Sequence, residues 1–493
     1  MSHCFRAQLA EDSFRHAAQR RASWLSSCSA SSWLDELIPA CRASGQASTR
    51  GLSSRALTQA RLVAVEGSPA AEEASPVWVL VGDLGGRVWL GCWQAQSVDA
   101  ESTSLGERTD APAISHSLLA AGDGGRVSAL VAAPPGLLKP AGSVSQSQWN
   151  DGFGAAFSLA GFGNGRIVLI ETARICTEAI RMDPTPDPDG ERSSVSLPPG
   201  LQAKVLQPAP VLAEGSISTN TTAAAITGIA CSPTHVRAPF FVWCNATGSW
   251  GMDVIDGSGS GGFRALERVH LRNEADSRSS STQPLVSGVD IHPDGALVAL
   301  AVPTPHPLFW DIRTAACYGY RQYGNTSSNQ TSMSAGRTTS VRWHPNGWHL
   351  ACATTGGVIL VWDIRQCNFD GSGNVADSAE SSRLSPLYRI PAHSGAVNGL
   401  AFGTFAPRDQ MGRSALASAF LASTGFDGTI RVWDANTYAL CADWPVATDH
   451  QRLSLDVIAS PFDSDGRASY ALVLAAQSDR LLHLFRYERA ASA

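Results

Sequence analysis

The feature that most restricts the fold of this chain is a repeat with a period of about 40–50 residues. Its clearest copy spans residues 393–434 and contains HSGAVNGLAFGTF, an insertion, and LASTGFDGTIRVWD. Near its end, Ile430 and Val432 alternate with Arg431, the period-two pattern of a half-buried strand. The Asp427-Gly428 pair before that strand predicts a tight turn. Each copy is therefore predicted to be a set of short antiparallel strands.

Six other copies follow the same plan with lower fidelity. Two of them also end in Trp-Asp: Ser287–Arg313 ends at Trp310-Asp311, and Thr339–Arg365 ends at Trp362-Asp363. With the weaker copies, we place seven units at about 60–120, 125–180, 225–275, 285–325, 337–390, 393–447 and 452–489. Such a unit cannot bury both faces of its sheet alone, so the copies must pack against one another, and a closed ring completes the core.

Segment 393–434 resembles a WD repeat. The resemblance implies an all-β chain: a single seven-bladed WD-repeat β-propeller over residues 53–490, with an irregular N-terminal extension over residues 1–52. The last unit supplies only three strands, so we expect residues within 25–52, such as Ser31–Ile38, to add a closing strand or a covering helix. The Ser-, Gly- and Pro-rich segments 102–120, 174–222, 257–283, 322–336, 366–390 and 403–415 are predicted to be surface loops.

The resemblance also implies a buried set of four polar side chains in the sixth unit. The matching positions are His393, Ser423, Asp427 and Trp433. An imidazole held between a carboxylate and a hydroxyl satisfies buried polar groups and ties strands together, so the expected role is structural. A Ser-His-Asp hydrolase would in addition need an exposed nucleophile and an oxyanion hole. We therefore expect no catalytic residue in this set.

Composition narrows the function classes. Apolar residues make up 44% of the chain and charged residues 16%, which predicts a folded protein, and the net charge of -6 makes nucleic acid an unlikely direct partner. The eleven cysteines show no C-x-x-C spacing, which favours reduced thiols in the cytoplasm or nucleus. The longest apolar runs are far shorter than the roughly 20 residues of a membrane helix, so no membrane insertion is predicted.

Motifs that carry chemistry are missing from the sequence. It has no phosphate loop, no G-x-S-x-G elbow, no H-E-x-x-H and no paired Cys/His spacing. We therefore expect a protein that is not an enzyme and has neither cofactor nor metal site.

Two consecutive units end in the tetrapeptide Trp-Asp-Ile-Arg, at 310–313 and 362–365. These boxes are similar to the tandem W-D-x-R boxes of WD-repeat substrate receptors of cullin-4 ubiquitin ligases, which implies that Arg313 and Arg365, with Asp311 and Asp363, contact the ligase adaptor. The presence of only two lysines would suit such a receptor. The alternative is that both arginines form hydrogen bonds within or between blades.

Other candidate contacts are Trp348 and Arg431, since Trp and Arg are enriched in binding hot spots, together with Arg342, Trp343 and His349. Trp343 and Trp348 equally suit the core of a blade. The leading functional hypothesis is a non-catalytic scaffold for protein-protein interaction, a subunit of an intracellular multiprotein complex. The alternative is the cullin-4 substrate receptor.

Overall fold

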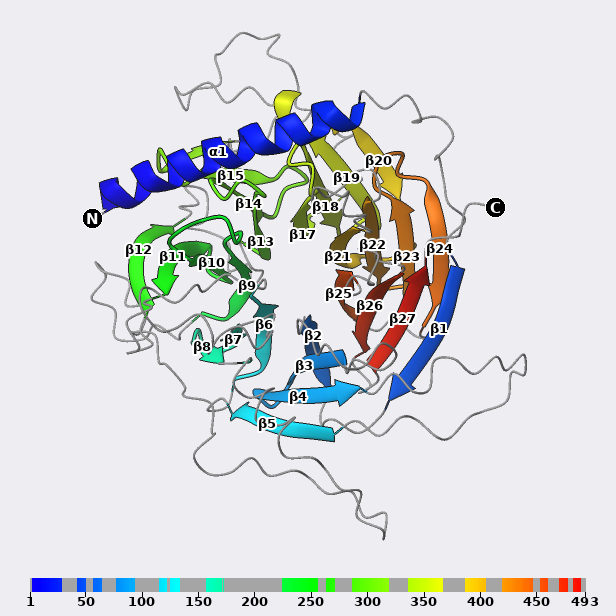
Figure 1. Ribbon diagram of the computed structural model, residues 1–493. Helices are drawn as coiled ribbons and strands as arrows, with labels where there is room; N and C mark the ends of the chain where they lie inside the picture. The colour runs from blue at the N-terminus through cyan, green and yellow to red at the C-terminus, as the bar shows by residue number, and fades with distance from the viewer. Residues whose placement is uncertain are drawn as a thin grey trace, which may run out of the picture.

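The computed structural model describes the chain in segments. The described residues are 2–28, 42–49, 56–63, 77–93, 115–121, 125–133, 157–170, 172, 224–255, 263–270, 286–318, 336–366, 386–404, 419–446, 453–459, 470–477 and 482–488. Their strands form seven sheets of three or four strands each, standing around a central channel like the blades of a propeller (Figure 1). The predicted seven-bladed β-propeller is confirmed.

We number the sheets as blades 1–7 in chain order and call the strands of each blade a, b, c and d from the channel outward. Blade 1 contains β2 (Leu57–Val63), β3 (Val77–Asp83), β4 (Arg87–Trp93) and β5 (Ser115–Ala121). Blade 2 contains β6 (Val127–Ala132), β7 (Ser158–Phe162) and β8 (Ile167–Ile170). Blade 3 contains β9 (Ile226–Cys231), β10 (Phe240–Asn245), β11 (Ser249–Ile255) and β12 (Phe263–His270).

The next three blades carry the clearest repeats. Blade 4 contains β13 (Gly288–Ile291), β14 (Leu297–Ala301), β15 (Leu308–Asp311) and β16 (Ala316–Tyr318). Blade 5 contains β17 (Thr338–Trp343), β18 (His349–Thr354), β19 (Val358–Asp363), the short 3-10 helix η4 (Ile364–Gln366) and β20 (Tyr388–Pro391). Blade 6 contains β21 (Val397–Thr404), β22 (Ala419–Gly425), β23 (Thr429–Asp434) and β24 (Leu440–Pro445).

Blade 7 joins the two ends of the chain. Its strands are β25 (Leu453–Ala459), β26 (Tyr470–Gln477) and β27 (Leu482–Glu488), and its outermost strand is β1 (Arg42–Thr49). β1 pairs antiparallel with β27, so a strand from the extension 1–52 completes the sheet that the C-terminal strands begin. Ser31–Ile38 lies outside the described residues.

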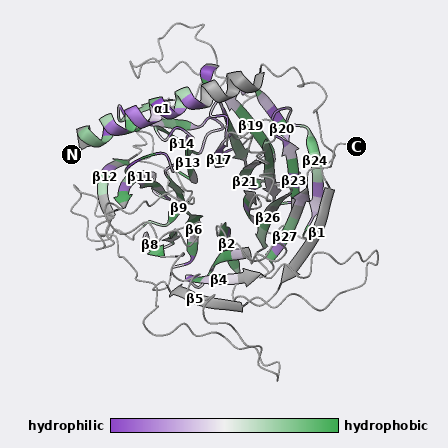
Figure 2. Cartoon of the chain, in the orientation of Figure 1, coloured by the Kyte–Doolittle hydropathy of each residue, from purple (hydrophilic) through white to green (hydrophobic). Residues whose placement is uncertain are grey.

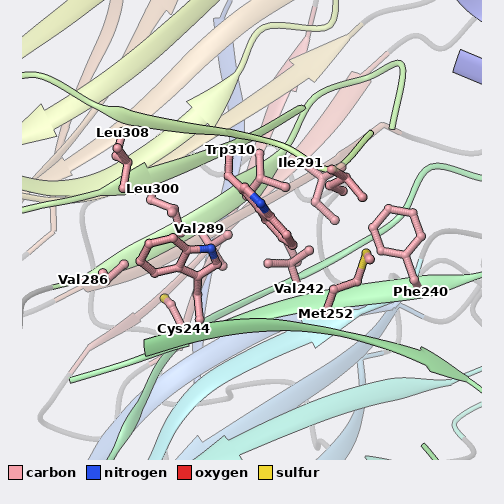
Figure 3. Close-up of a cluster of buried hydrophobic side chains, with 14 of the residues drawn as sticks. Phe240, Val242, Cys244, Met252, Val286, Val289, Ile291, Leu300, Leu308 and Trp310 are labelled. Carbon is pink, nitrogen blue, oxygen red and sulfur yellow. The ribbon is translucent and has the colours of Figure 1, made fainter. Parts of the chain in front are cut away.

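The core is divided among the seven junctions between neighbouring blades. The a strands contact one another around the whole ring, from β2 through β6, β9, β13, β17 and β21 to β25 and back to β2. Each junction holds its own cluster of buried apolar side chains. Figure 3 shows the cluster between blades 3 and 4, where Trp310 of strand c packs toward Val242 and Met252 of the preceding blade. The Trp of a Trp-Asp pair is thus a core residue of a junction.

The turns at the two ends of the strands define two faces of the ring. The a–b and c–d turns lie on one face, which we call the a–b face, and the b–c turns and d–a connections lie on the other, the b–c face. Each Trp-Asp pair ends strand c, so its Asp lies on the a–b face opposite the start of strand b, as His349 opposite Asp363 illustrates.

The extension, which the sequence predicts as irregular, forms the long helix α1 over Ser2–Cys28. Phe5, Leu9, Asp12 and Ser13 form one stripe of the helix and are buried. Phe5 packs edge-on against Phe240 at 5.9 Å between ring centroids, and Leu9 joins the core between blades 3 and 4. Among the side chains of α1 that the structure describes, the apolar residues Phe5 and Leu9 join this core, and hydrophilic and hydrophobic residues alternate along the coloured part of the helix (Figure 2), so the sequence pattern is weak. Among the described residues, no helix is long and apolar enough to cross a membrane.

Three d strands overlap segments predicted as surface loops. β12 lies within 257–283, β5 begins within 102–120 and ends at Ala121, and β20 begins within 366–390 and ends at Pro391. A d strand pairs on one side only and carries little apolar alternation; in β20 only Ile390 is buried. The prediction of loops was wrong at these strands because an outer edge strand resembles a loop in composition.

Candidate functional site

The four polar residues predicted in blade 6 come together between its strands. Trp433 Nε1 donates to Ser423 Oγ at 2.9 Å, and Ser423 Oγ lies 2.9 Å from His393 Nε2. On the other side of the imidazole, His393 Nδ1 lies 3.0 Å from Asp427 Oδ1. This chain of hydrogen bonds runs from the end of strand c, through strand b, to the connection that enters the blade.

Burial keeps the imidazole of this set neutral. The side chain of His393 is fully buried, and desolvation lowers its pKa although Asp427 partly opposes the shift. Desolvation acts to raise the pKa of Asp427. The neighbouring His393, the backbone N–H of Ser394 and the hydroxyl of Thr429 outweigh it, so the pKa of Asp427 is lowered. A neutral His393 that donates from Nδ1 to this carboxylate can accept the Ser423 hydroxyl at Nε2. Ser423 has no exposed surface, so its oxygen is not available as a nucleophile.

Two glycines that the sequence did not mark as important make room for His393. A Cβ atom at Gly425 would collide with the His393 imidazole, so strand b can hold only glycine beside the ring. Gly357, in the b–c turn of blade 5, has a φ of 77°, and a Cβ there would collide with the His393 carbonyl. The Gly357 carbonyl also accepts the His393 N–H at 2.9 Å. Blade 5 therefore positions the entry to blade 6 directly.

Other blades close the b–c turn differently. In blade 1, Asp83 accepts the backbone N–H groups of Gly85 and Arg87 and lies 3.3 Å from Trp89 Nε1. In blade 3, Asn245 Oδ1 accepts three donors from Thr247 and Ser249. The family pattern is complete in blade 6, while an Asp or Asn side chain caps the b–c turn in blades 1 and 3.

Comparison with known families agrees with this geometry. The family model described as WD domain, G-beta repeat, matches residues 384–434, which cover the entry to blade 6 and its strands a, b and c. The chain is a seven-bladed β-propeller, and its residues 384–434 match a WD repeat.

The Trp-Asp-Ile-Arg boxes of this WD-repeat protein have the same geometry in blades 4 and 5. Arg313 Nε and Nη2 lie 3.1 and 2.8 Å from the two carboxylate oxygens of Asp311. Arg365 makes the same two bonds to Asp363 at 2.9 and 2.7 Å. These bonds raise the pKa of each guanidinium. The arginines thus bind an aspartate of their own blade, and each still exposes about half of its side chain on the a–b face, 47% for Arg313 and 56% for Arg365.

The remaining candidates are distributed over both faces. Trp348 lies beside the blade 5 box, with its ring 4.7 Å from the Arg365 guanidinium carbon. Arg431 lies toward the b–c face, where it contacts Asp443 at 3.2 Å and Asp427 at 3.6 Å. Trp343 is a buried core residue between blades 4 and 5. The structure therefore brings Trp348 together with Arg365 and separates Arg431 from both.

The sequence reasoning named Arg342 but missed the charged set that it forms with Asp290 on the innermost strands of blades 4 and 5. Asp290 Oδ2 accepts the backbone N–H of Trp343 in the next blade at 2.7 Å, and Arg342 Nη1 reaches back to the Val289 carbonyl at 3.5 Å. Burial raises the pKa of Asp290, and Arg342 opposes that shift. The partners come from neighbouring a strands far apart in sequence, so no local motif marks them.

The same arrangement recurs where the ring closes. Asp456 Oδ2 of blade 7 accepts the N–H of Leu62 in blade 1 at 2.8 Å, and Arg61 Nη1 reaches Ser454 Oγ at 3.1 Å and the Leu455 carbonyl at 3.3 Å. These bonds tie blade 7 to blade 1. Within the described segments, no group of three or more His, Cys, Asp or Glu residues could hold a metal ion.

Proposed function

We propose that this WD-repeat propeller is a non-catalytic interaction scaffold that serves as a subunit of a multiprotein complex in the cytoplasm or nucleus. The observation that carries the proposal is the pair of arginines on the a–b face, each held by a buried aspartate of its own blade and each half exposed. An arginine that is already oriented loses little side-chain freedom when a partner binds. The buried Ser-His-Asp set supports a structural rather than a hydrolytic role.

The second candidate function is that of substrate receptor for a cullin-4 ubiquitin ligase. It is favoured by one specific observation: the two boxes lie in adjacent blades, on the same face and with the same Arg–Asp pairing. A single adaptor could then contact both arginines at once. This candidate predicts that binding depends on Arg313 and Arg365 together.

The test is quantitative co-purification with the tagged full-length chain, beside the double variant Arg313→Ala/Arg365→Ala. The matched control is Arg337→Ala, because Arg337 is an exposed arginine whose carbonyl bonds Thr355 at the b–c face. Loss of a cullin-4 adaptor from the double variant alone would establish the receptor function. A stable set of other proteins, with no adaptor, supports the scaffold. Recovery of the chain as an isolated monomer in native extracts would contradict both.

A further inference from the structure

The two boxes share their Arg–Asp pair but differ in what surrounds it. The carbonyl of Trp348 accepts the N–H of Ile364 at 2.9 Å, and the carbonyl of Ala296 accepts the N–H of Ile312 at 3.0 Å, so Ala296 of blade 4 is the counterpart of Trp348 in blade 5. In blade 5 the Trp348 ring lies 4.7 Å from the Arg365 guanidinium carbon, whereas blade 4 has the methyl group of Ala296 at the equivalent position. At the next position, blade 4 has Leu297 opposite Asp311 where blade 5 has His349 opposite Asp363.

Aromatic contacts continue from the blade 5 box to blade 6. His349 Nδ1 lies 3.1 Å from the hydroxyl of Tyr438, which belongs to the c–d turn of blade 6. The ring of Tyr438 packs against that of Tyr388 at 5.1 Å between centroids. Tyr438 is buried, whereas Tyr388 is 41% exposed in the edge strand β20. We call Trp348, His349, Arg365, Tyr388 and Tyr438 the blade 5–6 patch.

Tyr438 occupies a position that disfavours a large side chain. Its φ is 57°, in the left-handed region that glycine adopts without strain. Two contacts explain why a tyrosine is nevertheless held there: its hydroxyl bonds His349, and its ring packs against that of Tyr388. The side chains of the patch thus hold one another in place by direct contacts.

Three guanidinium groups are exposed on this face. Arg237, Arg313 and Arg365, in blades 3, 4 and 5, expose 50%, 47% and 56% of their side chains, and their aspartate partners expose 9% or less. Asp434, at the end of strand c in blade 6, is half-buried on the same face and accepts the backbone N–H groups of Asn436 and Thr437. A partner that approaches Arg365 therefore meets its guanidinium N–H groups before the carboxylate of Asp363. Carboxylate oxygens are the strongest acceptors for such donors.

We propose that the blade 5–6 patch is the docking site for an acidic protein segment that carries an apolar or aromatic anchor residue. This inference rests on the proposed scaffold function and names its docking surface and the chemistry of its partner. The anchor packs on Trp348 and Tyr388, and an Asp or Glu of the segment accepts from Arg365. Arg365 is the single arginine of the patch, which can therefore neutralise few phosphates, and this disfavours nucleic acid.

The experiment selects peptides from a displayed library of random 12-residue sequences on the full-length chain and then measures the affinity of individual synthetic peptides by fluorescence anisotropy. We expect selected peptides to be rich in Asp and Glu around one apolar residue. Trp348→Ala and Arg365→Ala each weaken their binding at least tenfold, and Arg365→Lys weakens it too because an ammonium has no planar fork. Arg337→Ala, at the opposite face, is the matched control and changes it less than twofold.

Three results would overturn the proposal: no enriched peptide, enrichment of neutral or basic peptides, or equal affinity for wild type and Trp348→Ala. Tighter binding of a 12-nucleotide single strand that needs the same residues would also overturn it, in favour of nucleic acid. Should Trp348→Ala fail to melt like wild type, Tyr388→Ser gives the same test at an exposed position. If co-purified proteins remain on the patch variants, the docking site is wrong but the scaffold function stands; if nothing co-purifies with wild type, the scaffold function itself fails.

Discussion

Replacing Ser423 by alanine should open blade 6 locally. The Ser423 oxygen has no exposed surface and is the partner of both Trp433 Nε1 and His393 Nε2, so the substitution leaves two buried polar groups without it. Each unsatisfied buried group costs about 1–3 kcal/mol, which gives about 2–6 kcal/mol for the pair. Because about 1.4 kcal/mol is a factor of ten, opening should become roughly 30-fold to 20,000-fold more frequent.

The assay is hydrogen exchange, read on peptides that cover β22 and β23, under conditions where the rate reports the opening equilibrium. Ser394→Ala is the control, because the exposed Ser394 hydroxyl lies at 3.5 Å from Asp427 and its loss should change stability by less than about 0.5 kcal/mol. If Ser423→Ala and Ser394→Ala exchange equally fast, the four-residue set does not hold blade 6 together.

Three further predictions concern other parts of the ring. Asp456→Ala should lower the free energy of unfolding by about 1–3 kcal/mol, because the Leu62 N–H loses its acceptor. Asp456→Asn keeps an acceptor and should keep most of the stability. Equal urea midpoints for the two variants would contradict this. Burial lowers the pKa of His344 to about 3. Unfolding therefore takes up a proton between about pH 6.5 and 3. The free energy of unfolding should fall as the pH decreases through that window, by about 1.4 kcal/mol per pH unit from this residue. His344→Asn keeps an acceptor for the turn and should flatten the pH dependence of urea unfolding; an unchanged slope would exclude His344 as the source. Leu9→Glu should remove the exchange protection of α1 and leave that of the blades, and loss of protection throughout the ring would show that the helix is needed to fold it.

The parts of the fold that were readable from the sequence are those where local chemistry repeats. Trp310, Trp362 and Trp433 each precede an Asp at the end of a buried strand, and the strand alternation before them marks strand c. The blade 6 set was predicted from the resemblance of segment 393–434 to a WD repeat, which assigns its four positions. These features depend on contacts within one blade.

The features that were not readable depend on contacts between blades or on docking. Asp290 and Asp456 bond a backbone N–H of the following blade, and nothing in their local sequence distinguishes them from other strand residues. Gly425 looks like an ordinary turn glycine until the position of His393 is known. The contact of Tyr438 with His349 joins residues of neighbouring blades and requires a φ that sequence patterns assign to glycine. The role of each of these residues can be inferred only from the closed ring.

The pairing of β1 with β27 has a consequence for the timing of synthesis. About 430 residues separate the two strands, and at about 5–20 residues per second the ribosome needs roughly 20–90 s to make them. During that interval β1 has no partner from its own blade, although the strands of blades 1 to 6 can pair as they emerge. Ring closure is therefore the last folding event, and the nascent chain must keep an unpaired strand out of wrong pairings until its own C-terminus arrives.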